Sequence, residues 1–266
     1  MVEIPIKTER AWDKDTLIQI NALRPGKVYN AQNLHKLQRR PEIPGKRTEY
    51  ISGSPGRSPE EKEAAGRVVG EASCAPPLQM KIPLLEYRMQ KGQKVLLPPS
   101  ARRVNVCIGW NSTNSMCDVD VSAFLLGDTG RVIGDDWFVF YGQTKSPDES
   151  TFFEMNGNTD REVICVDFEK LNPSVRKIVF VLTIHEAFQK KLNFGMLKDA
   201  YIRILNRDDQ KELVSFQMTD YYENVISMMI GELYLHNGNW KFHGIGNGAA
   251  KDLAGLCGLY GVQVSD

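Results

Sequence analysis

The sequence predicts an all-β protein: an antiparallel sandwich of two sheets with one short helix near the C-terminus. Three observations support this fold. Short runs of β-branched and aromatic residues recur from residue 80 onward, and turn-forming residues separate them. No regular alternation of strands with long helical segments is present, which argues against a doubly wound nucleotide-binding fold.

Proline divides the chain into two unlike regions. Eleven of the 13 prolines lie within residues 1–100, whereas 14 of the 16 aspartates lie beyond residue 100. Proline removes a backbone donor, so a region rich in it does not build long ladders or helices. We therefore expect 1–37 to be a small segment of unknown role, 38–79 a largely irregular linker, and 80–266 the β domain.

The first clear strand of this domain is RVNVCIG (103–109), in which apolar residues alternate with other residues at Val104, Val106 and Ile108. Asn237-Gly238 predicts a type I′ hairpin between the last two strands, because both residues tolerate positive φ. The other strands are predicted at VDVSAFLL (119–126), WFVFY (137–141), EVICVDF (162–168), KIVFVLTI (177–184), AYIRIL (200–205), ELVSFQM (212–218), ISMMIGELYLH (226–236) and WKFHGIG (240–246).

Two features follow the last strand. Residues 249–259 place Leu253, Leu256 and Leu259 near helical spacing, which predicts a terminal helix that covers the sandwich. The glycine-rich run 244–248 lacks the Lys-Ser/Thr pair of a phosphate-binding loop, and we interpret it as a closely packed entry to this helix.

Composition excludes several classes of function. Lys+Arg and Asp+Glu both total 33, so no overall charge favours nucleic acid, and no apolar run is long enough to span a bilayer. Five cysteines without a CxxC pair fit a reducing compartment, so we expect a soluble cytoplasmic protein. No nucleophile, base and orienting group can be assembled, so we expect no enzyme activity.

Acidic residues gather where strands begin. Asp118 and Asp120 lie on one face of a strand because side chains alternate with period two. Carboxylates on neighbouring loops repel each other unless a cation neutralises them, and Ca²⁺ takes 6–8 oxygen ligands. The alternative is that these acids cap turns and face solvent. The candidate ligands are Asp118, Asp120, Asp135, Asp136, Asn158, Asp160 and Glu162.

Residues 80–264 resemble the TerD domain family of tellurium-resistance and bacterial stress proteins. The matching segments keep the family's order over most of this region. They are Gly109-Trp110, DVDVSAFLLGDTG (118–130), DDWFVFY (135–141), KSP (145–147), KIVFVLTIHEA (177–187), NFGMLKDAYIRIL (193–205), GELYLHNGNWKFHGIGNG (231–248) and LAGLCGLYGV (253–262).

The resemblance implies a two-sheet sandwich that binds Ca²⁺ through acidic loops and has no established enzyme activity. It matches Asp118, Asp120, Asp135 and Asp136 to the family's acidic motifs. The family's third acidic loop is longer, whereas this chain has only Asn-Gly-Asn-Thr-Asp-Arg-Glu (156–162), with Arg161 in place of an acid. We therefore expect one calcium site, with two as an alternative.

The sequence leaves two functions open. In the first, a calcium-binding stress-response protein interacts with other stress or tellurium-resistance proteins, in the cytoplasm or peripherally at the inner membrane. In the second, the metal site has degenerated, and the sandwich is a scaffold or small-ligand module whose specificity lies in residues 1–79. Neither function involves nucleic acid.

Overall fold

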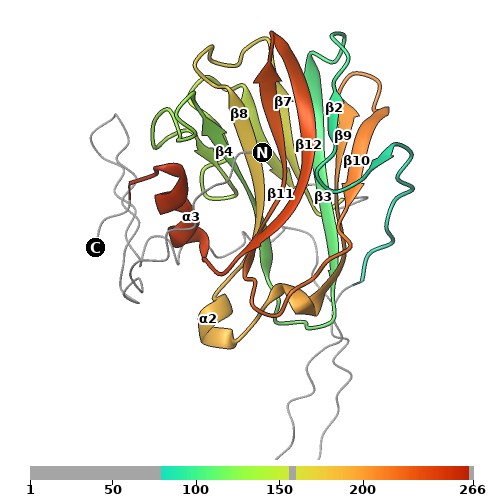
Figure 1. Cartoon of the computed structure of the whole chain (residues 1–266), viewed down its shortest axis with the longest axis vertical. Helices are drawn as coiled ribbons and strands as arrows, with labels where there is room; N and C mark the ends of the chain where they lie inside the picture. The colour runs from blue at the N-terminus through green and yellow to red at the C-terminus, as the bar shows by residue number, and fades with distance from the viewer. Residues whose placement is uncertain (1–78, 156–159, 264–266) are drawn as a thin grey trace, which may run out of the picture.

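A computed structural model describes residues 79–155 and 160–263 of the chain. The expectations for residues 1–37 and nearly all of the linker lie outside the described residues. Within them, twelve strands form two six-stranded sheets that face each other, as Figure 1 shows. All strand pairs are antiparallel except β1 with β10, so the predicted antiparallel sandwich is confirmed.

The order of strands in each sheet places distant parts of the chain side by side. Sheet A contains, in spatial order, β1 (Arg88–Met89), β10 (Glu212–Gln217), β9 (Leu197–Asn206), β3 (Arg103–Ser112), β7 (Glu162–Asp167) and β6 (Thr151–Met155). Sheet B contains β2 (Lys94–Leu96), β12 (Asn239–Ala249), β11 (Ser227–His236), β8 (Lys177–Ile184), β4 (Val119–Leu126) and β5 (Phe138–Val139).

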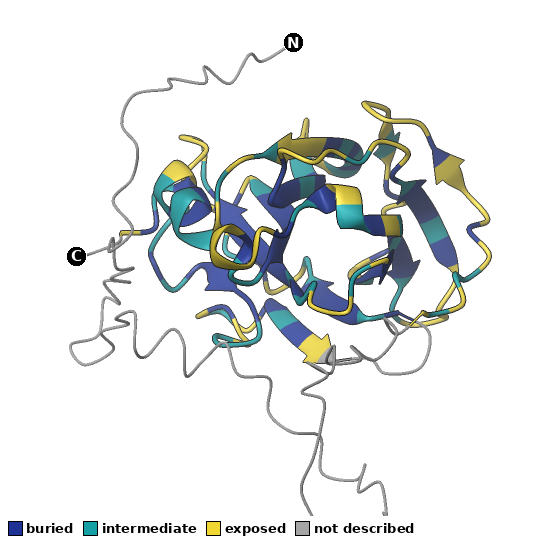
Figure 2. Ribbon diagram, turned by 90° about the horizontal axis from the view of Figure 1, so that it is seen from below, coloured by how far each residue is buried: buried dark blue, intermediate teal, exposed yellow. Residues whose placement is uncertain are grey.

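The main core lies between the two sheets. Alternate residues of each strand enter it, for example Val104, Val106 and Ile108 of β3 and Ile178, Phe180 and Leu182 of β8, all with no exposed surface. Figure 2, seen from the end of the molecule that carries α2 (Ala187–Lys190), shows buried residues on the strands and exposed residues mainly in the connections. A short 3₁₀ turn, η1 (Phe194–Met196), leads from α2 into β9.

The predicted hairpin between β11 and β12 is confirmed. His236 pairs with Asn239, and the two residues between them, Asn237 and Gly238, have φ of 50° and 73°. Both values lie in the left-handed region that a type I′ turn requires.

The predicted terminal helix is α3 (Leu253–Tyr260), which packs on the outer face of sheet B. Leu256, Cys257 and Tyr260 contribute to a second apolar cluster with Phe124 and Phe138 from β4 and β5. Figure 1 shows the helix beside β4, at the side of the sandwich. One half of sheet B is therefore covered on both faces.

The interpretation of residues 244–248 as a helix entry is wrong, because they continue strand β12 to Ala249. Small residues are needed there for close packing. A Cβ atom on Gly244 would lie 2.9 Å from the Phe216 side chain, and one on Gly248 would lie 2.5 Å from that of Val225. Strands β1, β2 and β6 were not predicted at all.

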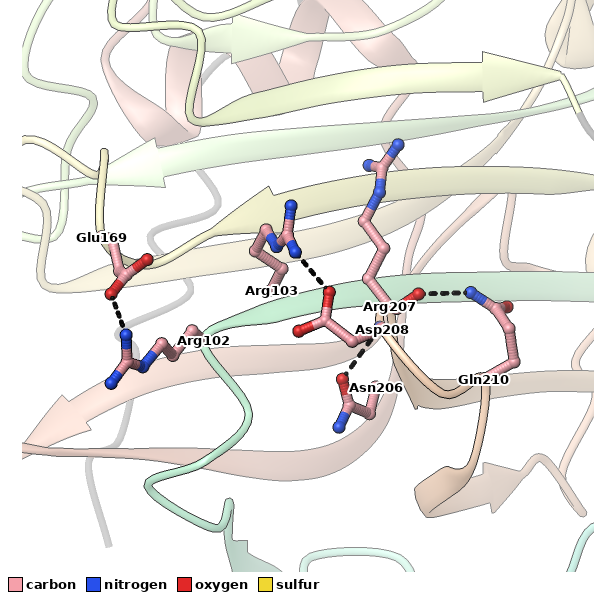
Figure 3. Close-up of polar contacts among 7 residues, drawn as sticks. All are labelled: Arg102, Arg103, Glu169, Asn206, Arg207, Asp208 and Gln210. Carbon is pink, nitrogen blue, oxygen red and sulfur yellow. Dashed lines mark hydrogen bonds and ion pairs between the residues drawn. The ribbon is translucent and has the colours of Figure 1, made fainter.

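At the end of the sandwich opposite α2, acids are paired with arginines. Arg102 donates to Glu169 at 3.0 Å, and Arg103 donates to Asp208; both contacts are drawn in Figure 3. Arg207, the third arginine in this view, also donates to Glu154 at 3.3 Å. These side chains are largely exposed, so each pair contributes little to stability, on the order of 0–1 kcal/mol.

None of the helices in the described part of the chain is long and apolar enough to cross a membrane.

The structure predicts how α3 is held at its start. The Asp252 carboxylate accepts a hydrogen bond of 2.9 Å from the Gly255 amide, which is the arrangement of a helix N-cap. Asp252→Ala should lower the free energy of unfolding by about 1 kcal/mol, measured by urea denaturation. Asp252→Asn keeps an acceptor oxygen and should cost less. Equal losses for the two variants would contradict the capping role.

Candidate metal centre

Strand β4 positions the first two candidate ligands. Asp118 immediately precedes the strand and Asp120 is its second residue, while Val119 and Val121 enter the core between the sheets. The predicted period-two pattern is therefore confirmed: the acids project from the face opposite the core. The Asp118 carbonyl accepts a hydrogen bond of 2.8 Å from the His185 amide, which fixes the start of β4 beside the end of β8.

Glu162 reaches the same strand from the other sheet. Strand β5 pairs with β4 at Ala123 and Phe124, beyond Val121 along the strand. At Val121 the Glu162 carboxylate accepts the backbone N–H at 2.8 Å, and Glu162 is only 3% exposed. A side chain of β7 thus occupies the position that a neighbouring strand's carbonyl would have, and it links the two sheets.

Tyr141 is within electrostatic range of these three acids. Its hydroxyl oxygen is buried and has no hydrogen-bond partner among the described residues. Burial raises the pKa of Tyr141 well above its ordinary value, and the charges of Asp120, Asp118 and Glu162 raise it further. The charges of all three carboxylates act on one buried hydroxyl, so we take the edge of β4 as the candidate centre. We call Asp118, Asp120, Glu162 and Tyr141 the β4-edge site.

Asp160 has a different environment, although it is only two residues from Glu162. Its carboxylate accepts two hydrogen bonds from Arg203, of 3.0 and 2.8 Å, and one of 2.8 Å from the Tyr201 hydroxyl. The Asp160 side chain is 2% exposed. A carboxylate held by three donors is already neutralised, so Asp160 does not belong to the β4-edge site.

The two remaining described candidates lie at the other end of β4. Phe138 pairs with Phe124, which places Asp136 about level with Leu126. Leu126 is six positions along the strand from Asp120, or roughly 20 Å away. Asp135 accepts a hydrogen bond of 3.0 Å from the Gln263 amide and, with Asp136, lines an open hollow beside Trp137. Asn158, the last of the candidates, lies outside the described residues.

The structure therefore divides the predicted ligand set rather than gathering it. Within residues 79–155 and 160–263, no three His, Cys, Asp or Glu side chains are close enough to hold a metal by themselves. At the β4-edge site, a calcium ion would need the three carboxylates together with carbonyl or water oxygens. Sequence reasoning missed Tyr141, although WFVFY (137–141) was assigned as a strand and its alternation could have placed this residue beside the core.

The cysteines of the described region are free thiols. Cys107, Cys165 and Cys257 are buried, and Cys117 is partly exposed. Burial raises the pKa of each of these thiols, to about 12 for Cys165, so all four are less nucleophilic than an ordinary cysteine at neutral pH.

This environment predicts selective alkylation. In a Cys74→Ser variant of the folded protein, iodoacetamide should modify Cys117 slowly and leave the three buried thiols intact, as measured by peptide mass spectrometry. Because the pKa of Cys117 is raised, the rate should still increase at a pH where a free cysteine has levelled off. Modification of Cys165 or Cys257 as fast as Cys117 would contradict the burial described here.

The comparisons with known proteins agree with the fold. The TerD domain model matches residues 85–260. The tellurium resistance protein TerD of Serratia marcescens is 38% identical over 192 residues, which cover 68% of this chain and 100% of that protein. General stress protein 16U of Bacillus subtilis is 34% identical over 189 residues, 66% of this chain and 97% of that protein. The chain therefore belongs to the TerD family.

Proposed function

We propose that this protein is a calcium-binding stress-response protein whose ion is held at the β4-edge site. The observation that carries the proposal is the buried Tyr141 hydroxyl, which has no partner among the described residues and is within electrostatic range of Asp118, Asp120 and Glu162. Three negative charges around a partly buried position repel one another, and a dication offsets that repulsion.

The donor chemistry supports calcium rather than a softer metal. Carboxylate oxygens are hard ligands, and Ca²⁺ accepts 6–8 of them together with carbonyl and water oxygens in flexible geometry. A calcium-bound water could also serve as a hydrogen-bond partner for the Tyr141 hydroxyl. Glu162 would bind the ion while one of its oxygens keeps the hydrogen bond from the Val121 amide.

The proposal includes one ion, not two. Asp135 and Asp136 lie at the opposite end of β4, and Asp135 already accepts a hydrogen bond from the Gln263 amide.

We also propose that the protein acts by binding and not by catalysis. Calcium would order the α2 end of the sandwich and so prepare it to contact other stress-response proteins. The tellurium-resistance and general-stress names of its relatives support this placement.

Calcium should stabilise the full-length protein. At a calcium concentration about 100 times Kd, binding adds about 2.7 kcal/mol to the free energy of unfolding. For a domain of this size that corresponds to a rise in Tm of roughly 5–10 °C. The measurement is a thermal melt with Ca²⁺ and with chelator. Asp120→Asn and Glu162→Gln should each reduce the rise.

Asp136→Asn is the matched control, because it removes a carboxylate that lies before β5, beside the far end of β4. It should leave the calcium-dependent rise in Tm unchanged. An equal loss in this variant would indicate a second ion near Asp135 and Asp136. If millimolar Ca²⁺ does not shift Tm in the wild-type protein, the calcium proposal fails and the alternative of a metal-free scaffold is favoured.

A further inference from the structure

The segment 160–162, which leads into β7, is held by three different contacts. Asp160 lies on the outer face of sheet A, where it meets Arg203 and Tyr201 of β9. The Arg161 backbone N–H donates to the Ile108 carbonyl at 3.0 Å. Glu162, the next residue, faces the opposite way and contacts β4 between the sheets. The chain thus directs two acids to opposite faces of the same sheet.

The contact between Arg203 and Asp160 is strong and directional. Two parallel N–H···O bonds join the guanidinium to the carboxylate, and the two side chains are 12% and 2% exposed. Burial strengthens such a pair but makes the loss of one partner costly, since the other would remain as an unpaired buried charge. Asp160 is therefore fixed in one position.

Gly109 of β3 makes the third contact of Asp160 possible. A Cβ atom at this position would lie 2.5 Å from the Tyr201 hydroxyl oxygen, closer than atoms can approach. With glycine there, the Tyr201 hydroxyl can pass over β3 and donate to Asp160 at 2.8 Å. The neighbouring residue, Trp110, accepts a bond of 2.6 Å from the Arg161 side chain through its carbonyl. The Arg161 guanidinium also lies 5.4 Å from the Trp110 ring centre.

We infer that Arg203 and Tyr201 are positioning residues of the β4-edge site: by anchoring Asp160 on the outer face of sheet A, they hold Glu162 against Val121 and in reach of calcium. This inference rests on the proposed calcium function for its last step only. The anchor itself is a property of the calcium-free protein. Groups that orient a metal ligand without touching the ion commonly change metal affinity by about 10–100-fold when they are altered.

The first experiment needs no calcium. Amide hydrogen exchange, followed by NMR in the presence of chelator, reports the bond from the Val121 N–H to Glu162. Arg203→Lys keeps the charge but loses the paired geometry, and should increase exchange at Val121 by about tenfold. The amide of Phe180, in the central strand β8, is the internal reference. Its exchange should be unchanged unless the whole domain is destabilised.

The second experiment measures calcium affinity by calorimetric titration. Arg203→Lys should raise Kd by about tenfold, and Tyr201→Phe, which removes one hydrogen bond, should raise it less. Arg207→Lys is the matched control. Arg207 directly follows β9 and also pairs with a carboxylate, that of Glu154, but at the end of the sandwich shown in Figure 3. It should alter neither Kd nor exchange at Val121.

The outcomes separate the two proposals. If the wild-type protein binds no calcium but Arg203→Lys exposes the Val121 amide, the positioning role stands and the calcium function fails. If calcium binds to the wild-type protein and Arg203→Lys changes neither Kd nor Val121 exchange, the positioning role is wrong. If Phe180 exchange shows that Arg203→Lys folds poorly, Kd and Val121 exchange are measured in Tyr201→Phe instead. If both quantities stay at their wild-type values in Tyr201→Phe, the inference is also wrong.

Discussion

The reach of Glu162 across the sandwich is the constraint on which the candidate centre depends. Strand β4 is paired by β8 along its length and by β5 over only part of its other edge. At Val121 the carboxylate of Glu162 satisfies the backbone donor that the short β5 does not reach. Because an unsatisfied buried N–H is costly, this contact both closes the edge and brings a negative charge to the two aspartates that start β4.

Much of the fold could be predicted from sequence because its strands obey a period of two. β3, β4 and β8 have one apolar face each, and the Asn237-Gly238 turn identifies its hairpin by the positive φ values that it needs. The missed strands β1 and β2 have two and three residues, too few to show a period. The full length of β12 could not be predicted, because its last residues are rich in glycine, which is uncommon in strands. Gly244 and Gly248 are required by close contacts with Phe216 and Val225, and those contacts cannot be read from the local sequence.

The candidate centre was less predictable, because it too depends on contacts between residues far apart in the sequence. Alternation places Asp118 and Asp120 on one face, and that part was predicted correctly. Alternation does not reveal which end of a strand a distant loop meets, so Asp136 was grouped with acids that lie roughly 20 Å away. Nor does it reveal pairing: Asp160 and Arg203 are separated by 43 positions, and only the antiparallel register of β3 with β7 and β9 brings them together.

The charges of residues 160–162 have a structural consequence for Glu162. An acid at position 161 would have lain beside Asp160 and Glu162, whereas Arg161 donates to the Trp110 carbonyl and lies over its ring. A positive charge held there reduces repulsion along the segment, and the bidentate pair of Arg203 neutralises Asp160. Two arginines thus leave Glu162 as the acid of this segment that faces β4. A segment with one acid directed at β4 fits the proposed single calcium ion, which would be bound mainly from β4.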